Sequence, residues 1–207
     1  HEAILFAPQG APKSFAGSEV IPLFGMPLPL YPELQLTPPQ SGIMARLRRF
    51  NPDIVHLAGP AALGVTGRHV GKRLGVPLVA TYHTDLPSYT AHYGMGCLRE
   101  LGYRYLRWIH NGCALTLCPS SATLDDLRAH GFRRLRLWGR GVDTAAFHPA
   151  FRSEEWRRST GLKDGETLLL YVGRLAAEKR LDVLVEAIRE MEGVRLVLVG
   201  DGPARPA

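Results

Sequence analysis

Two cations follow a predicted buried strand in the C-terminal part of the sequence. Residues 168–179 read LLLYVGRLAAEK, so Arg174 comes directly after Gly173 at the end of an apolar run, and Lys179 precedes a helical pattern. The amino end of a helix offers unpaired N–H groups, and a guanidinium fork suits phosphate oxygens. The sequence therefore predicts an anion site for a diphosphate. The alternative is an ordinary loop with two solvated cations, and charge alone does not decide between them.

A second group of polar residues follows the strand predicted at residues 78–82. Residues 81–93 read TYHTDLPSYTAHY and leave the carboxyl end of a parallel strand, where open α/β sheets bind their ligands. His83 is a candidate hydrogen-bond donor or general acid–base there, and a satisfied structural histidine is the alternative. The histidines without ligand spacing are predicted to be structural: His1, His56, His69, His110, His130 and His148.

A third candidate is the segment GDGP, which begins at Gly200 and ends at Pro203. It follows an apolar run at residues 194–199. Glycine permits close approach of the backbone to a ligand, and proline can occupy the first position of a helix. The alternative is a simple tight turn between a strand and a helix.

The elements that would position these residues alternate between strands and helices. Apolar runs at residues 54–57, 78–82 and 115–118 are separated by helical patterns at residues 61–74 and 95–110. Such alternation predicts an α/β fold with a parallel sheet that helices cover on both faces. Further predicted elements are strands at residues 3–7, 20–24 and 135–138, a helix at residues 43–50, and a βαβ unit at residues 167–199.

Two local predictions concern less regular stretches. Residues 26–39 are rich in proline, which cannot donate to a central ladder, so they are predicted to form a long surface loop. In the helix predicted at residues 95–110, Arg104 and Arg107 lie on one side. The opposite side is predicted to carry Leu98, Leu101, Gly102, Tyr105 and Ile109.

Composition limits the class of protein. The chain has 207 residues, of which 45% are hydrophobic, and a net charge of +6. No apolar run reaches the roughly 18 residues of a membrane helix, and no signal-peptide pattern is present, so a cytoplasmic setting is predicted. The cations are spread along the chain without interleaved aromatic platforms, which predicts no nucleic-acid partner. The three cysteines form no metal-binding pair and are expected to be reduced.

The segment at residues 139–149, GRGVDTAAFHP, has turn residues at both ends and no periodicity. It is predicted to be a linker, which divides the chain into an N-terminal Rossmann-like domain at residues 1–147 and the start of a second one at residues 148–207. The sequence begins at His1 and stops just after a predicted strand. We therefore expect an internal fragment, truncated at both ends, in which the N-terminal domain lacks its first strand.

Together these motifs resemble the retaining glycosyltransferases of family 4. VGRLAAEK is followed by LVLVGDGP and preceded by RGVDTAAFHP and TYHT, so the resemblance extends from about residue 51 to residue 203. HTDLPSYTAHYG and RLWGRGVDTAAFHPAFRS are most similar to bacterial GDP-mannose-dependent α-mannosyltransferases and sulfoquinovosyl diacylglycerol synthases. The resemblance implies the GT-B fold, in which two Rossmann-like domains face a cleft.

The resemblance also implies an activity and roles for individual residues. It implies transfer of a hexosyl group, with mannosyl favoured, from a GDP- or UDP-linked sugar to a lipid or glycan acceptor, with retention and without a metal. The implied catalytic residues are His83, Arg174 and Lys179, the donor-binding residues are Gly173, Arg174, Lys179, Gly200, Gly202 and Pro203, and the acceptor-binding residues are Asp85, Tyr89 and Tyr93.

Two other functions remain as alternatives, namely a non-catalytic nucleotide-sugar-binding module of the same fold and a nucleotide-sugar epimerase. The family's glycine-rich first loop and its paired glutamates are expected outside residues 1–207, so the fragment alone is predicted to be inactive. A basic surface predicts peripheral contact with an anionic membrane, on the inner face of the cell membrane. The residues assigned to this surface are Arg46, Arg48, Arg49, Arg104 and Arg107.

Overall fold

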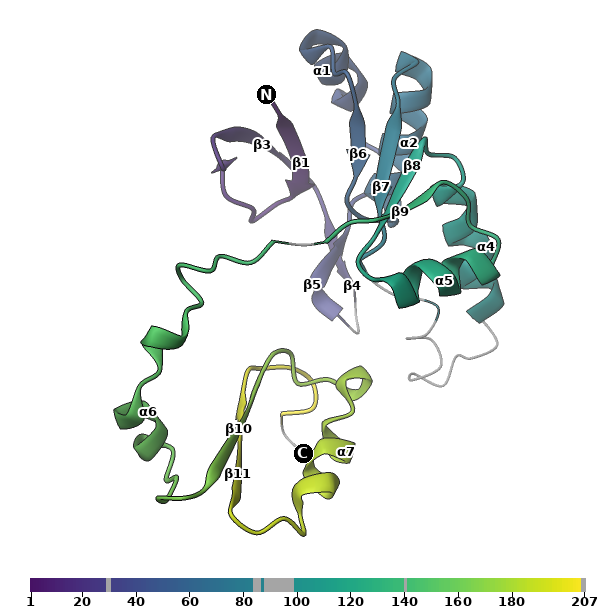
Figure 1. Ribbon diagram of the computed structural model, residues 1–207. Coiled ribbons are helices and arrows are strands. Elements are labelled where there is room, and N and C mark those ends of the chain that lie inside the picture. Colours follow the sequence, from purple (N-terminus) through teal and green to yellow (C-terminus); the bar gives the residue numbers. More distant parts are fainter. Residues whose placement is uncertain (29–30, 84–86, 88–98, 140, 206–207) are drawn as a thin grey trace. The chain divides into compact units, whose positions relative to one another are not determined.

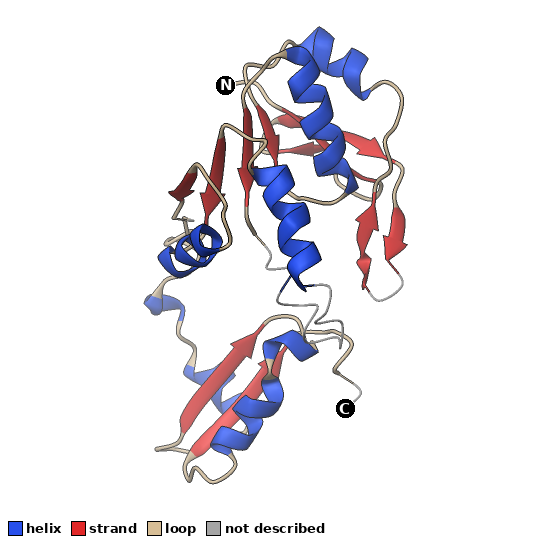
Figure 2. Ribbon diagram, turned by 90° about the vertical axis from the view of Figure 1, so that its right-hand side faces the viewer, coloured by secondary structure: helices blue, strands red, loops and turns tan. Residues whose placement is uncertain are grey.

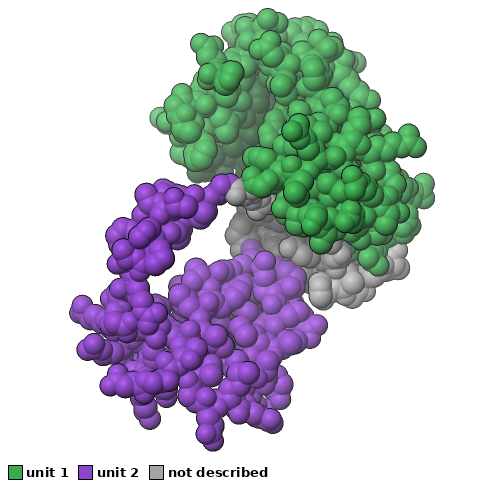
Figure 3. All heavy atoms as spheres, viewed as in Figure 1, with its two compact units in different colours: residues 1–87, 97–140 green, residues 88–96, 141–207 purple. Residues whose placement is uncertain are grey.

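The computed structural model describes residues 1–28, 31–83, 87, 99–139 and 141–205. The chain forms two compact units, which Figure 3 distinguishes by colour. Residues 1–87 and 97–140 make the first unit, and residues 88–96 and 141–207 make the second.

Parallel strands form the centre of the first unit (Figure 1). One sheet has the order β6-β7-β8-β9 and is parallel throughout, and a smaller sheet has the order β1-β3-β2. The strands are β1 (Ile4–Pro8), β2 (Ser14–Phe15), β3 (Ser18–Leu23), β6 (Val55–Leu57), β7 (Leu78–Thr81), β8 (Leu115–Cys118) and β9 (Leu135–Leu137). The helices are α1 (Ile43–Phe50), α2 (Ala62–Leu74), α4 (Arg99–His110) and α5 (Ser121–Ala129).

The helices α2, α4 and α5 connect successive strands of the four-stranded sheet (Figure 2). Leu57 and Ala80 pack with Ile109 of α4, and Cys118 packs with Leu127 of α5. Because the strands are parallel and in sequential order, these crossovers place the three helices on one face of the sheet. The predicted parallel sheet is therefore confirmed. Helices were predicted to cover both of its faces, but the described helices α2, α4 and α5 all cover the same face.

Helix α2 approaches the sheet closely because it carries glycine at the contact positions. A Cβ atom added at Gly67 would lie 2.7 Å from Leu57 Cδ2, and one at Gly71 would lie 2.4 Å from Leu78 Cδ2. Both distances are shorter than van der Waals contact. The two glycines thus set the height of α2 above β6 and β7.

The prediction of a surface loop at residues 26–39 was wrong. Strands β4 (Met26–Leu28) and β5 (Tyr31–Leu36) form an antiparallel pair in which Met26 is the partner of Leu36. In a two-stranded sheet each strand has an outer edge that forms no ladder hydrogen bonds, so proline is tolerated there. The register shifts between Pro27 and Leu28, where proline interrupts the regular pairing.

The predicted orientation of the helix at residues 95–110, which the structure shows as α4, was also wrong in part. Its buried residues include Tyr103, Leu106 and Ile109, whereas Leu101 is 59% exposed and Tyr105 is 38% exposed. The sequence offers two apolar stripes on this helix, and hydrophobic periodicity alone does not decide which one faces the core. The second stripe therefore points to solvent.

The second unit contains the predicted βαβ arrangement. Strands β10 (Thr167–Val172) and β11 (Val194–Val199) are parallel, with Thr167 opposite Val194. The elements around them are two 3-10 helices and two α-helices: η2 (Pro149–Phe151), α6 (Glu154–Ser159), η3 (Ala177–Lys179) and α7 (Leu181–Ile188). Residues 138–139 and 141–148 form neither a helix nor a strand.

Among the helices that the structure describes, none combines the length and apolar character that a membrane span requires. Cys113 and Cys118 are buried free thiols.

One histidine is buried in the core of the first unit. The side chain of His110 is 2% exposed, and its Nδ1 atom lies 3.2 Å from Thr116 Oγ1. Its ring packs near the rings of Tyr82 and Phe132, at centroid distances of 5.7 and 5.8 Å. Burial lowers the pKa of His110 to about 4. The folded protein therefore holds this histidine neutral at pH values where the unfolded chain protonates it.

We predict that His110 makes folding sensitive to acid. Between the unfolded pKa of 6.5 and the folded pKa of about 4, the unfolded state binds more protons, so stability falls as pH decreases through this range. The loss should approach about 3 kcal/mol at pH 4. His110→Gln retains a hydrogen-bonding group for Thr116 without titrating, and urea unfolding of this variant should lack that part of the pH dependence. The exposed His69→Gln is the control, and equal slopes for both variants would contradict the prediction.

Candidate functional site

The loops that follow β10 and β11 are joined by backbone hydrogen bonds. Gly173 N donates to Val199 O at 2.9 Å, and Leu175 N donates to Asp201 O at 2.9 Å. Ala204 N donates back to Leu175 O at 3.0 Å. Because the two strands are parallel neighbours, both loops leave the same edge of the sheet. The structure thus brings the segment around Arg174 and the GDGP segment together at the carboxyl edge of the two strands.

The glycines of GDGP are required by contact with the neighbouring loop. Gly200 has φ 155°, and a Cβ atom there would lie 1.8 Å from Gly173 O. Gly202 has φ 156°, and a Cβ atom there would lie 2.1 Å from Leu175 O. L-residues avoid such φ values, and no side chain fits at these distances. The close backbone approach that these two glycines permit is therefore an approach of one loop to the other, within the protein itself.

The two predicted cations differ in their surroundings. Arg174 is half-buried, and its carbonyl oxygen accepts a hydrogen bond of 2.8 Å from the hydroxyl of Tyr171, which braces the loop. Lys179 is exposed at the end of η3. Arg180, with φ 49°, separates η3 from α7. The α-helix therefore does not begin directly at Lys179, because one 3-10 turn intervenes.

The amino end of α7 already has a carboxylate from its own chain. Arg180 Nε donates to Asp182 Oδ1 at 3.1 Å. The hydrogen bond from Arg180, and also the backbone N–H of Val183, lower the pKa of the Asp182 carboxyl. An incoming anion would compete with this carboxylate for the N–H groups of the first turn. The candidate anion site therefore depends on Arg174 and Lys179 more than on the α7 amides.

His83 lies at the carboxyl end of β7 in the first unit, and its ring centroid is 6.5 Å from that of Trp138. On the adjacent strand β6, His56 Nε2 is 2.6 Å from Thr81 Oγ1. Partial burial and, to a lesser extent, positive charge at His83 lower the pKa of His56. The exposed side chains of His56, His83 and Trp138 thus gather in this part of the sheet, and the buried Thr81 contacts His56.

His56 was predicted to be structural, and Trp138 was not predicted to be a site residue. No local pattern marks His56, because its contact with Thr81 depends on the strand register, which pairs His56 with Val79, two residues before Thr81. Strand alternation then places His56 and Thr81 on the same face of the sheet. Trp138 follows β9, and its backbone N–H donates to Cys118 O at 2.8 Å, which holds Trp138 beside the end of β8.

The predicted site residues fall into three groups. Gly173, Arg174, Lys179, Gly200, Gly202 and Pro203 belong to the two loops and η3 of the second unit, and His83 belongs to the first unit. Asp85, Tyr89 and Tyr93 lie outside the described residues. The roles of all these residues stay predictions. Within the described ranges, no group of three or more His, Cys, Asp or Glu side chains is placed to hold a metal ion.

Two family descriptions match consecutive parts of the chain. Residues 1–146 match Glycosyltransferase Family 4, and residues 152–206 match Glycosyl transferases group 1. The first match alone covers more than half of the chain. Its end falls in the segment between β9 and η2, and the second match starts directly after η2.

Curated relatives extend this likeness over nearly the whole sequence. A GDP-mannose-dependent α-mannosyltransferase from Mycobacterium tuberculosis is 38% identical over 98% of this chain and 54% of its own length. The sulfoquinovosyl transferase SQD2 of Arabidopsis thaliana is 36% identical over 94% of this chain and 39% of its own length. The chain therefore spans about half the length, or less, of these relatives.

A solved structure shares the path of the chain. The crystal structure of Anabaena HepE in complex with UDP-glucose matches 97% of this chain and 61% of its own, with a TM-score of 0.67 and 18% sequence identity. At this identity the likeness concerns the fold alone. It confirms the predicted α/β fold class of the GT-B type.

We predict that Gly200→Ala destabilises the second unit through contact with the neighbouring loop. The new Cβ atom would meet Gly173 O, so the hydrogen bonds between the loops must break or the backbone must shift. Urea unfolding should show a loss of about 3 kcal/mol or more. Gly193→Ala is the matched control, because Gly193 also has positive φ, 68°, but has no atom within 4 Å of the added Cβ. It should lose only about 1 kcal/mol. Equal losses would show that close approach is not what requires glycine at position 200.

Proposed function

The chain belongs to glycosyltransferase family 4, and from this premise we propose that the protein transfers a hexosyl group from a nucleotide-diphosphate sugar to a lipid or glycan acceptor with retention. Mannosyl is the favoured group, and GDP-mannose the favoured donor. The name of the mycobacterial relative supports this choice of sugar and base. The chain spans only part of that relative, so activity and substrates are proposed for the full-length protein.

The observation that carries the proposal is the pair of joined loops in the second unit. They hold the backbone of Arg174 beside Gly200 and Gly202, at the carboxyl edge of two parallel strands. A guanidinium there offers a planar fork for the oxygens of a diphosphate, and Lys179 adds a mobile point charge. Both charges would stabilise the negative charge that develops on the leaving nucleoside diphosphate.

In the first unit, His83 is the proposed catalytic group. His83 would contact the donor sugar through a ring nitrogen, with Trp138 packed near its ring. Two positively charged histidines close together repel each other, so His56, whose pKa is lowered, stays neutral more readily beside a protonated His83. His56 is therefore the member of this pair that holds a proton less readily.

Binding and turnover must be measured together to test the proposal. The full-length protein would be titrated with GDP-mannose, UDP-glucose and UDP-sulfoquinovose, and products would be assayed with and without acceptor. Transfer from GDP-mannose to an acceptor supports the proposal. Tight binding without product would instead identify a non-catalytic nucleotide-sugar-binding module. An altered nucleotide sugar that forms without acceptor would identify an epimerase.

We predict that Arg174→Ala in the full-length enzyme lowers kcat by about 10²-fold or more, a size typical of losing one preorganised charge contact. Arg174→Lys should recover only part of this loss, because lysine keeps the charge but lacks the planar fork. Lys179→Ala should also lower kcat by about 10²-fold. The control is Arg189→Ala, which removes a solvent-exposed arginine after α7. Near-normal turnover of the Arg174 and Lys179 variants would refute the assignment.

We predict that His83→Ala impairs transfer more than folding. Its side chain is exposed, so its removal should change the melting temperature little, while kcat should fall by about 10²-fold if the histidine acts on the reacting groups. Steady-state kinetics and thermal unfolding would be measured on the same preparation, with His69→Ala as the exposed control. Unchanged kinetics together with a lower melting temperature would assign His83 a structural role.

A further inference from the structure

The outward side of α4 carries apolar side chains. Leu101, Tyr105 and Trp108 recur at intervals of four and three residues and are 59%, 38% and 48% exposed. The core-facing stripe of the same helix contains Tyr103 and Leu106. A helix that is apolar on its outward side as well places large side chains in water, which marks a contact surface when charges surround them.

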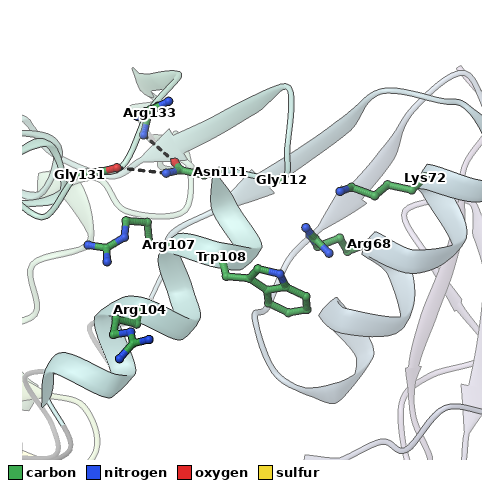
Figure 4. A pocket seen from close by; sticks show the side chains of 9 residues that line it. All are labelled: Arg68, Lys72, Arg104, Arg107, Trp108, Asn111, Gly112, Gly131 and Arg133. Carbon is green, nitrogen blue, oxygen red and sulfur yellow. Dashed lines mark hydrogen bonds between the residues drawn. The ribbon is translucent and has the colours of Figure 1, made fainter.

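Trp108 of this stripe lines a surface hollow of about 620 Å³ together with several cations (Figure 4). We name this hollow the basic hollow, and its lining residues are Arg68, Lys72, Arg104, Arg107, Trp108, Asn111, Gly112, Gly131 and Arg133. Five of these residues are cationic and none is acidic. Within the described part of the chain, no carboxylate forms an ion pair with any of the five. The resulting positive potential favours an anionic partner.

The fold holds the cations of the basic hollow in place. The guanidinium of Arg68 lies over the Trp108 ring, 4.2 Å from its centroid. Gly112 makes room for it, because a Cβ atom there would lie 2.4 Å from Arg68 Nε. Arg107 Nη1 donates to His130 O at 2.8 Å. These contacts reduce the rotamer entropy that binding would otherwise cost.

Asn111 fixes the opposite wall of the basic hollow, as the dashed lines in Figure 4 show. Its side-chain Nδ2 donates to Gly131 O at 3.1 Å, and its Oδ1 accepts from Arg133 N at 2.8 Å. The turn that carries Arg133 is therefore joined to the end of α4. Residues of α2, of the end of α4 and of the turn before β9 thus line the basic hollow together.

Within the first unit, the basic hollow and His83 lie toward opposite ends of the strands. Lys72 is in the last turn of α2, Arg107 is in the last turn of α4, and Arg133 precedes β9. These positions lead into the amino ends of strands, whereas His83 follows the carboxyl end of β7. Cations near helix carboxyl ends also complement helix dipoles. That effect explains Lys72 and Arg107, but it does not explain the exposed Leu101 and Trp108.

We propose that the basic hollow and the outward stripe of α4 dock this protein on an anionic membrane surface. Lipid phosphates would occupy the basic hollow, while Leu101, Tyr105 and Trp108 would enter the interface, where aromatic rings and cations are favoured. Charge complementarity and the apolar stripe together select a lipid surface. A nucleic acid would match the cations but would leave the aliphatic Leu101 without a use.

This surface differs from the one predicted from sequence, which combined the arginines of α1 with those of α4. Arg46 of α1 pairs with Glu19. A separate hollow is lined by Ile4, Glu19, Arg46, Arg49 and Phe50. The arginines of α1 thus serve as a control for the proposal.

Vesicle co-sedimentation of the full-length protein tests the proposal, with vesicles of phosphatidylcholine alone or with about 30 mol% phosphatidylglycerol. Wild-type protein should bind only the anionic vesicles, and binding should weaken between about 0.05 M and 0.5 M salt. Lys72→Glu/Arg104→Glu should reduce the partition coefficient by more than about tenfold. Arg48→Glu/Arg49→Glu makes the same charge change on exposed residues of α1 and should change it much less. Equal losses from both double variants would overturn the proposal.

The apolar stripe and the source of the phosphate need their own comparisons. Leu101→Ser should weaken vesicle binding even in high salt, whereas Leu137→Ser, at a position that is 53% exposed in β9, should not. Glycerol 3-phosphate at constant ionic strength should leave vesicle binding unchanged. Displacement by this compound would show a site for soluble phosphates and would overturn the membrane proposal. Circular dichroism would verify folding, and no readout depends on sugar transfer, so the transferase proposal is tested separately.

Discussion

Close approach of one backbone or helix to another, at positions where only glycine fits, determines the geometry of both units. In the second unit the loops after β10 and β11 exchange hydrogen bonds because Gly200 and Gly202 present no Cβ atom to the opposing carbonyls. The position of Arg174 follows from that pairing. In the first unit Gly67 and Gly71 let α2 lie close against Leu57 and Leu78. This close packing of α2 against the sheet places the guanidinium of Arg68 over the ring of Trp108 on α4.

The sequence was informative where a single physical signal dominated. Uniformly apolar strands separated by helical patterns predicted the parallel order, and β8 was placed with its observed ends, Leu115–Cys118. The prediction failed where two signals competed. Prolines 27 and 32 suggested a loop, but the outer edges of a two-stranded sheet tolerate them. Helix α4 has two apolar stripes, and only tertiary packing shows that Tyr103 and Leu106 face the core.

The candidate site was predictable to the extent that strand order determines it. Loops that follow adjacent parallel strands must meet, so the predicted βαβ unit already implies that the Arg174 loop and GDGP lie at one edge. The contacts that shape this edge were not predictable from local patterns. The closeness of Gly200 to Gly173 O depends on strand register, and the meeting of His56 with Thr81 depends on the pairing of β6 with β7. The carboxylate of Asp182 at the start of α7 changes which groups can bind an anion.

The two edges of the four-stranded sheet favour different chemistry for a common reason. Parallel strands direct their carboxyl ends, and with them His83, to one edge, whereas the helix carboxyl ends reach the other, where Lys72 and Arg107 complement the helix dipoles. A basic surface therefore arises at little cost on the edge opposite His83, where Trp108 is also exposed. Strand β7 has only four residues, which corresponds to roughly 13 Å between the two edges. Docking through the basic hollow would leave His83 accessible to a soluble donor, and a membrane-bound acceptor would need to extend by about that distance to reach it.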